Sequence, residues 1–371
     1  MARFRPPPRA SPPASSATAA PGTGRTGTLS VAARPGSSAF WGFGTALPEH
    51  RLEAEAGLAV LSRFWPRLRG VRPEPVTRHL VRPLEWLLEP RPLGETMRTY
   101  AQQAARLARL ASGRALSAAG VEPGEIDLVI SVSCTGYLVP SLDVQLAADL
   151  GLRPDVIRLP LTELGCSGGA AGIAAAHRHL AAFPHDRVLV VAVELPSLTF
   201  QHRDRSLDNL TAALVFGDGA AAAVMGGPGR RPGSELRVMG AGTWLVPGSA
   251  WALGFDLRDH GFHVVLDRRL PDLVREGLGE AATGFRRRQG LERIDFYAVH
   301  AGGPRVLDAV AEALELEPDR LALSRRVFRE VGNLSSASIL FVLAALSEAR
   351  GEGLAIAFGP GVTIELLHLR R

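Results

Sequence analysis

The pattern of apolar and polar positions predicts helices and strands in alternation. Apolar residues recur at helical spacing over residues 96–119 and again over 270–289, and a glycine directly follows each stretch, as is common where a helix ends. A largely apolar stretch over 128–133 predicts one strand, and the stretch over 187–193, apolar after Arg187, predicts a strand that is covered on both faces, because a strand with one wet face alternates in polarity. From residue 40 onward the pattern is therefore that of an α/β protein.

Shorter elements are expected between these. They are a helix over 141–149, a strand over 156–159, a helix over 166–182, a strand over 296–299 and a helix that begins near Leu334. The helices that begin at Cys166 and near Leu334 are both rich in Ala, Ser and Gly. Small side chains let helices approach closely, so we expect both helices to be buried and central.

Spacings between corresponding positions indicate that the second half repeats the first. Ile126 precedes Cys166 by 40 residues, and Ile294 precedes Asn333 by 39 residues. In each half a further 20 residues lead to another apolar strand. We interpret the period of about 168 residues as two βαβ-type halves related by duplication.

The chain is expected to comprise a tail and two halves. Residues 1–37 are mostly Pro, Ala, Ser, Thr and Gly with scattered Arg, which predicts a disordered tail. The N-terminal half would then cover 38–228 and the C-terminal half 229–371. The first 48 residues hold five arginines and no acid, which accounts for the whole formal net charge of +5. The body is therefore neutral, which argues against nucleic-acid binding.

Residue counts exclude several kinds of chemistry. Only two cysteines occur in 371 residues, which rules out a disulfide framework or a Cys-rich zinc site and is typical of a reducing compartment. The chain contains no lysine, so Schiff-base chemistry and a P-loop lysine are both excluded. No apolar run reaches the roughly 20 residues that span a bilayer. Because the first residues also lack the apolar segment of a secretory signal, we expect a cytoplasmic protein.

Cys166 is the first candidate for chemistry. It lies where an extended stretch gives way to a helix, with glycines at positions 165 and 168. A helix N-terminus favours the thiolate, which is the nucleophilic form of cysteine. The alternative is a small buried packing residue.

His300 and Asn333 are the second and third candidates. His300 follows the strand over 296–299, and the carboxyl ends of strands are where open α/β sheets bind ligands. A structural histidine is the alternative there, and helix capping is the alternative for Asn333. Because Asn333 occupies in the second half the place that Cys166 holds in the first, a pseudo-twofold axis would bring both to one site, with His300 between them.

These three residue types together permit acyl transfer. A thiolate accepts an acyl group as a thioester, and a neutral imidazole and an amide donate hydrogen bonds to an enolate or thioester oxygen. No metal-ligand cluster, dinucleotide fingerprint or carboxylate pair in the sequence competes with this interpretation.

Five motifs follow one another along the chain, and three of them carry the candidate residues. Their order is Leu164-Gly165-Cys166, Phe216-Gly217-Asp218-Gly219-Ala220-Ala221, His300-Ala301-Gly302-Gly303-Pro304, Gly332-Asn333-Leu334-Ser335-Ser336 and Phe358-Gly359-Pro360-Gly361. In this order and spacing, the chain resembles the type III polyketide synthases, the chalcone synthase-like branch of the thiolase superfamily, from about residue 40 to residue 369. The resemblance implies a thiolase-like αβαβα layered fold built from two duplicated halves, and a homodimer.

The resemblance also implies roles. Cys166 would accept the acyl group, and His300 and Asn333 would decarboxylate malonyl-CoA and hold the resulting enolate. His300 would also keep Cys166 as a thiolate through an ion pair. The substrates would be CoA thioesters, with no cofactor or metal. The implied substrate-binding positions are Phe216 and Phe262 as gatekeepers, Cys134, Thr135, Thr199 and Ser335 in the cavity wall, Val139 reaching the partner's cavity, and Arg72 near the CoA phosphates.

The chain departs from the family pattern in two backbone-tuning positions. Ala301 replaces a proline, and Ala357 stands where a glycine is usual. Residues 194–201 are similar to those of bacterial members that make alkylresorcinols and alkylpyrones, which implies a fatty acyl starter and a pyrone or resorcinol product.

Three other functions remain as alternatives. A ketoacyl synthase that initiates fatty-acid synthesis shares the Cys-His-Asn set but performs a single condensation. A papain-like cysteine hydrolase has the same residue order, but it predicts an oxyanion glutamine before the cysteine and no duplication. A non-catalytic scaffold is disfavoured because all three candidate residues are present.

Overall fold

The computed structural model describes residues 36–70, 72–229 and 235–371. The predicted tail over 1–37 therefore lies almost entirely outside the described residues. The described strands are β1 (Ser38–Ala46), β2 (His50–Glu53), β3 (Thr77–Leu80), β4 (Leu128–Val132), β5 (Ile157–Leu161), β6 (Val188–Glu194), β7 (Gly219–Gly226), β8 (Arg237–Leu245), β9 (Leu253–Arg258), β10 (Gly261–Leu266), β11 (Phe296–Val299), β12 (Glu352–Gly359) and β13 (Thr363–Arg370). The described α-helices are α1 (Ala54–Phe64), α2 (Leu84–Leu87), α3 (Leu93–Ala119), α4 (Leu142–Leu150), α5 (Gly168–Ala182), α6 (Leu207–Val215), α7 (Leu270–Gln289), α8 (Pro304–Ala313), α9 (Ala322–Val331) and α10 (Ser338–Ala344).

Nine of these strands form one mixed sheet in which the order of the first half is repeated in the second. The sheet runs β11-β12-β13-β8-β1-β7-β6-β4-β5. In the first half β4 and β6 are parallel and β7 is antiparallel to β6. In the second half β11 and β12 are parallel and β13 is antiparallel to β12. The two halves meet where β1 pairs with β8. This order confirms the predicted fold class of duplicated α/β halves.

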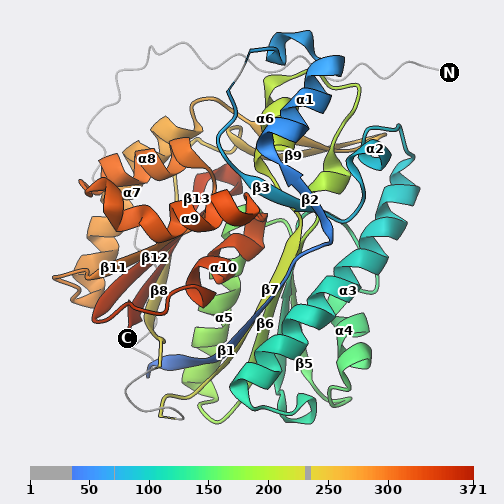
Figure 1. The fold of residues 1–371 in the computed structure, drawn as a ribbon. Helices are drawn as coiled ribbons and strands as arrows, with labels where there is room; N and C mark the ends of the chain where they lie inside the picture. Colours follow the sequence, from blue (N-terminus) through green and yellow to red (C-terminus); the bar gives the residue numbers. More distant parts are fainter. Residues whose placement is uncertain (1–35, 71, 230–234) are drawn as a thin grey trace, which may run out of the picture. The chain divides into compact units, whose positions relative to one another are not determined.

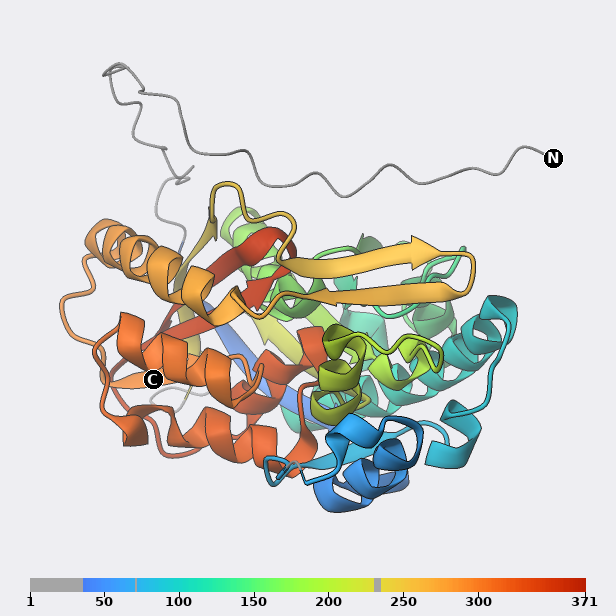
Figure 2. The ribbon, with the colours of Figure 1, turned by 90° about the horizontal axis from the view of Figure 1, so that it is seen from above.

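Helices cover the outer face of each half of the sheet, and a further layer of helices lies between the two halves (Figures 1 and 2). Helix α5 contacts β4 and β6 of the first half and β12 and β13 of the second, so it lies between the halves, and α10 packs against it. Helix α3 covers β1, β6 and β7 from outside, and α7 covers β8 and β13. A Cβ at Gly169 of α5 would collide with the backbone oxygen of Ser336 just before α10. The small residues of the two central helices are therefore needed for their close approach, as predicted.

Strand β6 shows why its sequence is apolar throughout. All seven of its residues are buried. Val188, Val190 and Ala192 face the central helices, while Leu189, Val191 and Val193 pack on the α3 side. Since successive side chains point to opposite faces of a sheet, a strand with helices on both faces needs apolar residues at every position.

Several boundaries differ from the prediction for local reasons. Helix α3 begins three residues before the predicted start, directly after the extended residue Pro92. The predicted helix over 166–182 opens with a 3-10 turn, Gly165–Ser167, and α10 opens with another, Ser335–Ala337. Strand β5 extends to Leu161, two residues beyond the predicted end. It is exposed over most of its length at the edge of the sheet, so its apolar pattern is weak.

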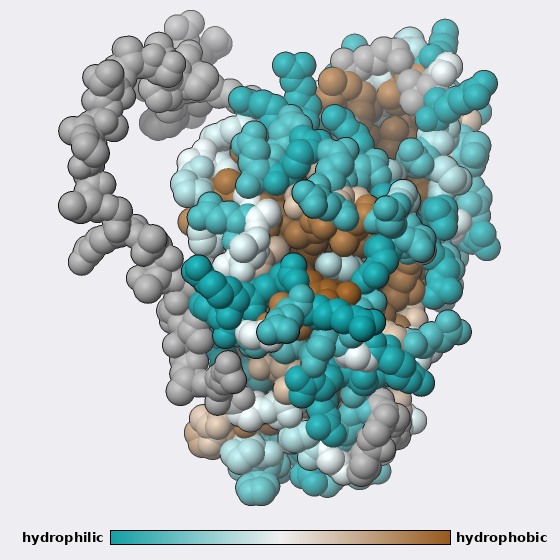
Figure 3. Space-filling model, turned by 90° about the vertical axis from the view of Figure 1, so that its left-hand side faces the viewer, coloured by the Kyte–Doolittle hydropathy of each residue, from teal (hydrophilic) through white to brown (hydrophobic). Residues whose placement is uncertain are grey.

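The described surface is mostly polar, and ion pairs lie on it. The face in Figure 3 is largely hydrophilic, with hydrophobic side chains gathered in its middle. Surface arginines are often paired with carboxylates; Arg275, for example, binds Asp272 and Glu312. Among the described residues, no helix is long and apolar enough to cross a membrane.

Candidate active site

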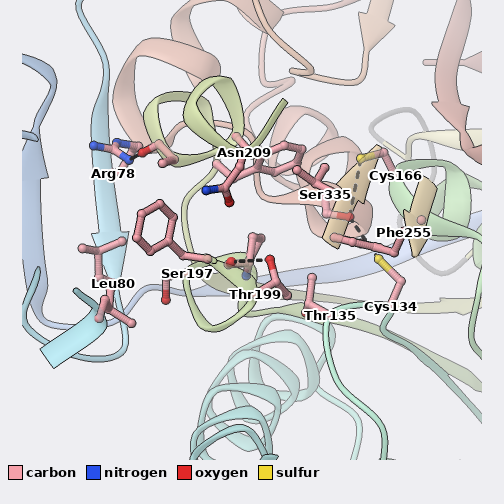
Figure 4. Close-up of a pocket in the computed structure, with 18 of the residues that line it drawn as sticks. Arg78, Leu80, Cys134, Thr135, Cys166, Ser197, Thr199, Asn209, Phe255 and Ser335 are labelled. Carbon is pink, nitrogen blue, oxygen red and sulfur yellow. Dashed lines mark hydrogen bonds between the residues drawn. The ribbon is translucent and has the colours of Figure 1, made fainter. Parts of the chain in front are cut away.

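Cys166 lines a pocket between the main sheet, α6 and the β9–β10 hairpin. The cysteine lies in the 3-10 turn directly before α5, so it is close to that helix's N-terminus, as predicted. The pocket contains about 980 Å³ of empty space, including its open mouth. Figure 4 shows Cys166, Cys134 and Ser335 at one end and Arg78 and Leu80 at the other.

Ser335 joins the two cysteines. The Cys166 thiol donates to the Ser335 hydroxyl at 3.5 Å, and the Cys134 sulfur lies 3.5 Å from the same oxygen. Ser335 adopts φ +48°, a left-handed conformation that is uncommon for a residue with a side chain. All three residues line the pocket, which agrees with the positions in the cavity wall that the resemblance implied for Cys134 and Ser335.

Glu194 is a buried carboxylate behind this group that the sequence analysis did not single out as a site residue. It lies at the end of β6 and is fully buried. Its oxygens accept hydrogen bonds from the Thr135 hydroxyl at 2.7 Å and the Cys134 N–H at 3.1 Å, and from Ser335 and Ser336. Burial raises the pKa of Glu194. The signal that could have revealed it is an acid at the carboxyl end of an otherwise apolar strand.

The Asn333 side chain is oriented by hydrogen bonds at both ends. Its Oδ1 accepts from the Ser335 N–H at 2.8 Å, and its Nδ2 donates to the Gly302 carbonyl at 3.2 Å. A hydrogen bond from Asn333 also lowers the pKa of Cys166. The amide oxygen is therefore occupied by the Ser335 N–H, and one amide hydrogen is donated to Gly302.

His300 directly follows β11, as predicted, and only 2% of it is exposed. Its ring lies over Gly302, where a Cβ would be 3.0 Å from the ring Cδ2. The ring Nδ1 is buried without a hydrogen-bond partner among the described residues. Because Gly302 is also the acceptor for Asn333, this glycine brings the candidate histidine and asparagine together.

Burial sets the charge states of the candidate groups. It raises the pKa of Cys166 to about 12, although hydrogen bonds from Ser335 and Asn333 oppose this shift. It lowers the pKa of His300 to about 4. For each group taken singly, burial favours the neutral form, because a low-dielectric interior penalises a charge.

The candidate gatekeepers occupy different positions. Phe216 lines the pocket and is joined to Asn333 by a parallel β-bridge. Phe262 is not among the residues that line the pocket. Its ring instead packs edge-on against Phe255 at 5.7 Å, and it is Phe255 that lines the pocket.

The other candidates divide in the same way. Thr135 and Thr199 line the pocket. Val139 and Arg72 do not: both are exposed, and Val139 is 80% exposed in the loop before α4. The sequence analysis missed the leucine-rich side of the pocket, which comes from β2, α1, β3 and α2, elements that it did not predict. Its leucines are Leu52, Leu61, Leu80, Leu84, Leu87 and Leu88.

Comparison with known proteins decides the family. The chalcone and stilbene synthase N-terminal domain matches residues 93–228, and the C-terminal domain of the same family matches residues 237–371. The chain belongs to the chalcone and stilbene synthase family. It is thus a type III polyketide synthase, a condensing acyltransferase, which confirms the resemblance inferred from the motifs.

The curated relatives include bacterial enzymes that form aromatic products. A 1,3,6,8-tetrahydroxynaphthalene synthase from Streptomyces peucetius is 40% identical over 88% of this chain and 91% of its own length. A phloroglucinol synthase from Pseudomonas fluorescens is 31% identical over 78% of this chain and 84% of its own length. The ketoacyl synthase alternative is not favoured by these relatives.

Solved structures support the same family. The crystal structure of 1,3,6,8-tetrahydroxynaphthalene synthase from Streptomyces coelicolor superimposes with a TM-score of 0.83 and is 34% identical, covering 90% of this chain and 99% of the other. A polyketide synthase from the brown alga Ectocarpus siliculosus also reaches 0.83, at 26% identity, covering 91% and 99%.

Proposed function

We propose that this enzyme extends an acyl-CoA starter by repeated decarboxylative condensation with malonyl-CoA on Cys166. The observation that carries the proposal is the placement of Cys166 at a helix N-terminus, in the wall of a pocket, with an Asn333 amide whose oxygen is already occupied. This arrangement presents a nucleophile together with hydrogen-bond donors for an oxyanion.

The proposed cycle begins with acyl transfer. The Cys166 thiolate attacks the starter thioester, CoA thiolate leaves, and the acyl group remains as a thioester on Cys166. Before this attack His300 takes the thiol proton and forms an ion pair with the thiolate, and it then gives that proton to the departing CoA thiolate. The charges of such a pair would offset part of the cost that burial imposes on each group alone.

Condensation then follows on malonyl-CoA. Loss of CO₂ leaves the electron pair of the broken C–C bond in an enolate, whose oxygen accepts hydrogen bonds from His300 and Asn333. The enolate carbon attacks the acyl carbonyl, and the Cys166 thiolate leaves. The product is a CoA thioester longer by two carbons, which reloads Cys166 for the next round until the chain cyclises.

For the product, we favour a polyhydroxylated aromatic compound such as 1,3,6,8-tetrahydroxynaphthalene. The support is the 40% identity to the Streptomyces peucetius synthase of that compound. The second candidate is a resorcinol or pyrone made from a fatty acyl starter. Its support is the run of leucines on the α1–α2 side of the pocket, which suits an alkyl chain.

We also propose a homodimer in which β5 and the loop that carries Val139 meet the partner. Ile157 and Leu159 of the edge strand are 54% and 37% exposed, and Tyr137 beside Val139 is 64% exposed. An exposed apolar edge strand is a ready site for pairing with another chain.

Arg72 is proposed to bind a CoA phosphate.

Mass spectrometry of the products tests the proposal. Wild-type enzyme is given ¹³C-malonyl-CoA alone, or with starters from acetyl-CoA to palmitoyl-CoA, with Cys166→Ala as control. Tetrahydroxynaphthalene from malonyl-CoA alone supports the first product class, and an alkyl-bearing product supports the second. A single condensation, or products that persist in the Cys166→Ala variant, would overturn the proposed cycle.

A further inference from the structure

Arg78 is a buried cation in the pocket wall that the proposed cycle does not use. It lies on β3, only 3% of it is exposed, and Figure 4 places it at the end of the pocket away from Cys166. Burial lowers the pKa of Arg78 to about 10, and the charge of Asp218 opposes this shift. The guanidinium group therefore stays charged at neutral pH. A buried charge destabilises a fold unless its contacts compensate for the cost.

The guanidinium group caps the C-terminal end of α6. The Arg78 Nη1 donates a hydrogen bond to the Ala213 carbonyl, in the last turn of that helix. The last carbonyls of a helix have no partner within it, and a cation at this end also interacts favourably with the helix dipole.

The partner that the Ala213 carbonyl would have in a longer helix is the N–H of Gly217, four residues later. That N–H instead donates to the Asn333 carbonyl at 3.0 Å, and the Asn333 N–H donates to the Val215 carbonyl at 2.9 Å. These two hydrogen bonds form the parallel β-bridge between Phe216 and Asn333. The bridge thus leaves the Ala213 carbonyl to the guanidinium group.

The aliphatic stem of Arg78 packs against both sides of this bridge. A Cβ at Gly332 would lie 3.1 Å from the Arg78 Cγ, and a Cβ at Gly217 would lie 3.5 Å from the Arg78 Cβ. Gly332 also adopts φ +75°, which favours glycine. The backbones directly before Asn333 and after Phe216 are therefore in contact with one side chain.

Asp218 ties the strand that carries Arg78 to the same bridge. The Asp218 N–H donates to the His79 carbonyl at 2.7 Å, and its carboxylate accepts from the Val81 N–H at 2.8 Å. Because Asp218 directly follows Gly217, β3 is fixed beside the backbone that holds the bridge.

We propose that Arg78 is a positioning residue for Asn333 in the decarboxylation of malonyl-CoA. This inference rests on the proposed role of Asn333. Without the guanidinium group, the Ala213 carbonyl and the Asn333 carbonyl compete for the single N–H of Gly217. The Asn333 backbone then loses a fixed partner, and its amide moves from the place where it stabilises the enolate oxygen.

The test separates decarboxylation from the reactivity of Cys166. Decarboxylation is measured in a Cys166→Ala background, where malonyl-CoA loses CO₂ and the enolate takes a proton from water to form acetyl-CoA. The reactivity of the thiol is measured in protein that keeps Cys166, as the rate of alkylation by iodoacetamide.

Arg78→Met keeps most of the stem and loses the hydrogen-bond donor. We expect its kcat for decarboxylation to fall about tenfold to a hundredfold, because a small displacement of a catalytic group is costly, while KM for malonyl-CoA is unchanged. Alkylation should slow by less than about threefold, because Ser335 also lowers the pKa of Cys166. Arg78→Lys keeps a shorter donor and should recover part of the lost kcat.

Arg51→Met is the matched control. Arg51 lies on the neighbouring strand β2 opposite His79, its side chain is 65% exposed, and it does not line the pocket. Both rates of this variant should equal those of the protein with Arg51.

Three results would overturn the inference. They are an unchanged kcat in Arg78→Met that is folded by circular dichroism, an equal fall of decarboxylation and alkylation, and a rise in KM alone, which would make Arg78 a substrate-binding residue. If Arg78→Met does not fold, the same criteria apply to Arg78→Lys. If the Cys166→Ala protein with Arg78 forms no acetyl-CoA, it is the proposed function of Asn333 that fails.

Discussion

The Cys166 sulfur lies 3.5 Å from the Ser335 hydroxyl oxygen, although 169 residues separate them in the sequence. This contact joins the two duplicated halves at the helix starts that the sequence predicted to be equivalent. The Ser335 hydrogen bond lowers the pKa of Cys166 against the effect of burial.

Ser335→Ala should therefore slow alkylation of Cys166 by iodoacetamide about fivefold at pH 8, the equivalent of a hydrogen bond of ~1 kcal/mol. Peptide mass spectrometry resolves Cys166 from Cys134, and an unchanged rate would contradict this contact.

The backbone of Ser335 predicts a difference between two variants that both lack the hydroxyl. At φ +48° an alanine is strained, whereas a glycine is not. Ser335→Gly should be more stable than Ser335→Ala by about 1 kcal/mol in urea unfolding. Equal stabilities would mean that the position is not held in the left-handed conformation.

The proposed ion pair between Cys166 and His300 predicts a pH dependence of alkylation. The His300→Gln variant has no histidine to pair with the thiolate. The pKa of Cys166 therefore stays at the value of about 12 to which burial raises it. The alkylation rate of this variant should rise about tenfold per pH unit up to pH 9, because only the thiolate reacts. In wild type a protonated His300 would stabilise the thiolate, so the rate should level off at a lower pH. A wild-type profile parallel to that of His300→Gln would show that no ion pair forms in the free enzyme.

The close approach of α5 to the segment before α10 predicts opposite effects for two helical glycines. Gly169→Ala should destabilise the protein by about 1–3 kcal/mol, because its Cβ collides with the Ser336 backbone. Gly113→Ala in α3 is the control. Gly113 is exposed and no atom lies within 4 Å of its added Cβ, so the higher helix propensity of alanine should stabilise the protein by about 0.5–1 kcal/mol. Urea unfolding measures both, and a neutral Gly169→Ala would contradict the packing described for the central helices.

The burial of Glu365 leads us to expect that the protein loses stability as the pH rises. Burial raises its pKa from 4.5 to about 7, so between these values the folded protein binds more protons than the unfolded chain, and its free energy of unfolding falls with rising pH. Glu365→Gln keeps an acceptor for the Thr243 hydroxyl, which lies 2.9 Å from the carboxylate, but does not ionise. Its stability relative to wild type should increase by up to ~3 kcal/mol between pH 4.5 and pH 7 and then remain constant. Urea titrations at pH 5 and pH 8 measure the change, and a difference independent of pH would refute it.

The elements that the sequence predicted well are those whose local signal coincides with their tertiary role. The apolar positions and closing glycine of α7 predicted its bounds, and β11 was predicted to the residue. The strands β1, β7, β8 and β13 were not predicted individually. Their pairing is between distant segments, so register and neighbours are fixed by contacts that no local pattern carries.

The candidate site was predicted in part for the same reason. Cys166, His300 and Asn333 stand at the ends of strands or the starts of helices, and short motifs mark them in the sequence. Glu194 and Phe255 carry no such motif. Their contacts are given by the structure, in which Glu194 accepts a hydrogen bond from Cys134 and Phe255 lines the pocket.

The sequence by itself determined the family, the duplicated architecture and the residues proposed for catalysis, because these depend on local patterns and on motifs at characteristic spacing. Only the tertiary structure decided which side chains share the pocket: Phe255 rather than Phe262 lines it, and Ser335 contacts both cysteines. The physical reason is that a pocket wall is assembled from segments far apart in the chain. The position of a side chain within that wall depends on the packing behind it, as the ring of Phe262 behind Phe255 demonstrates.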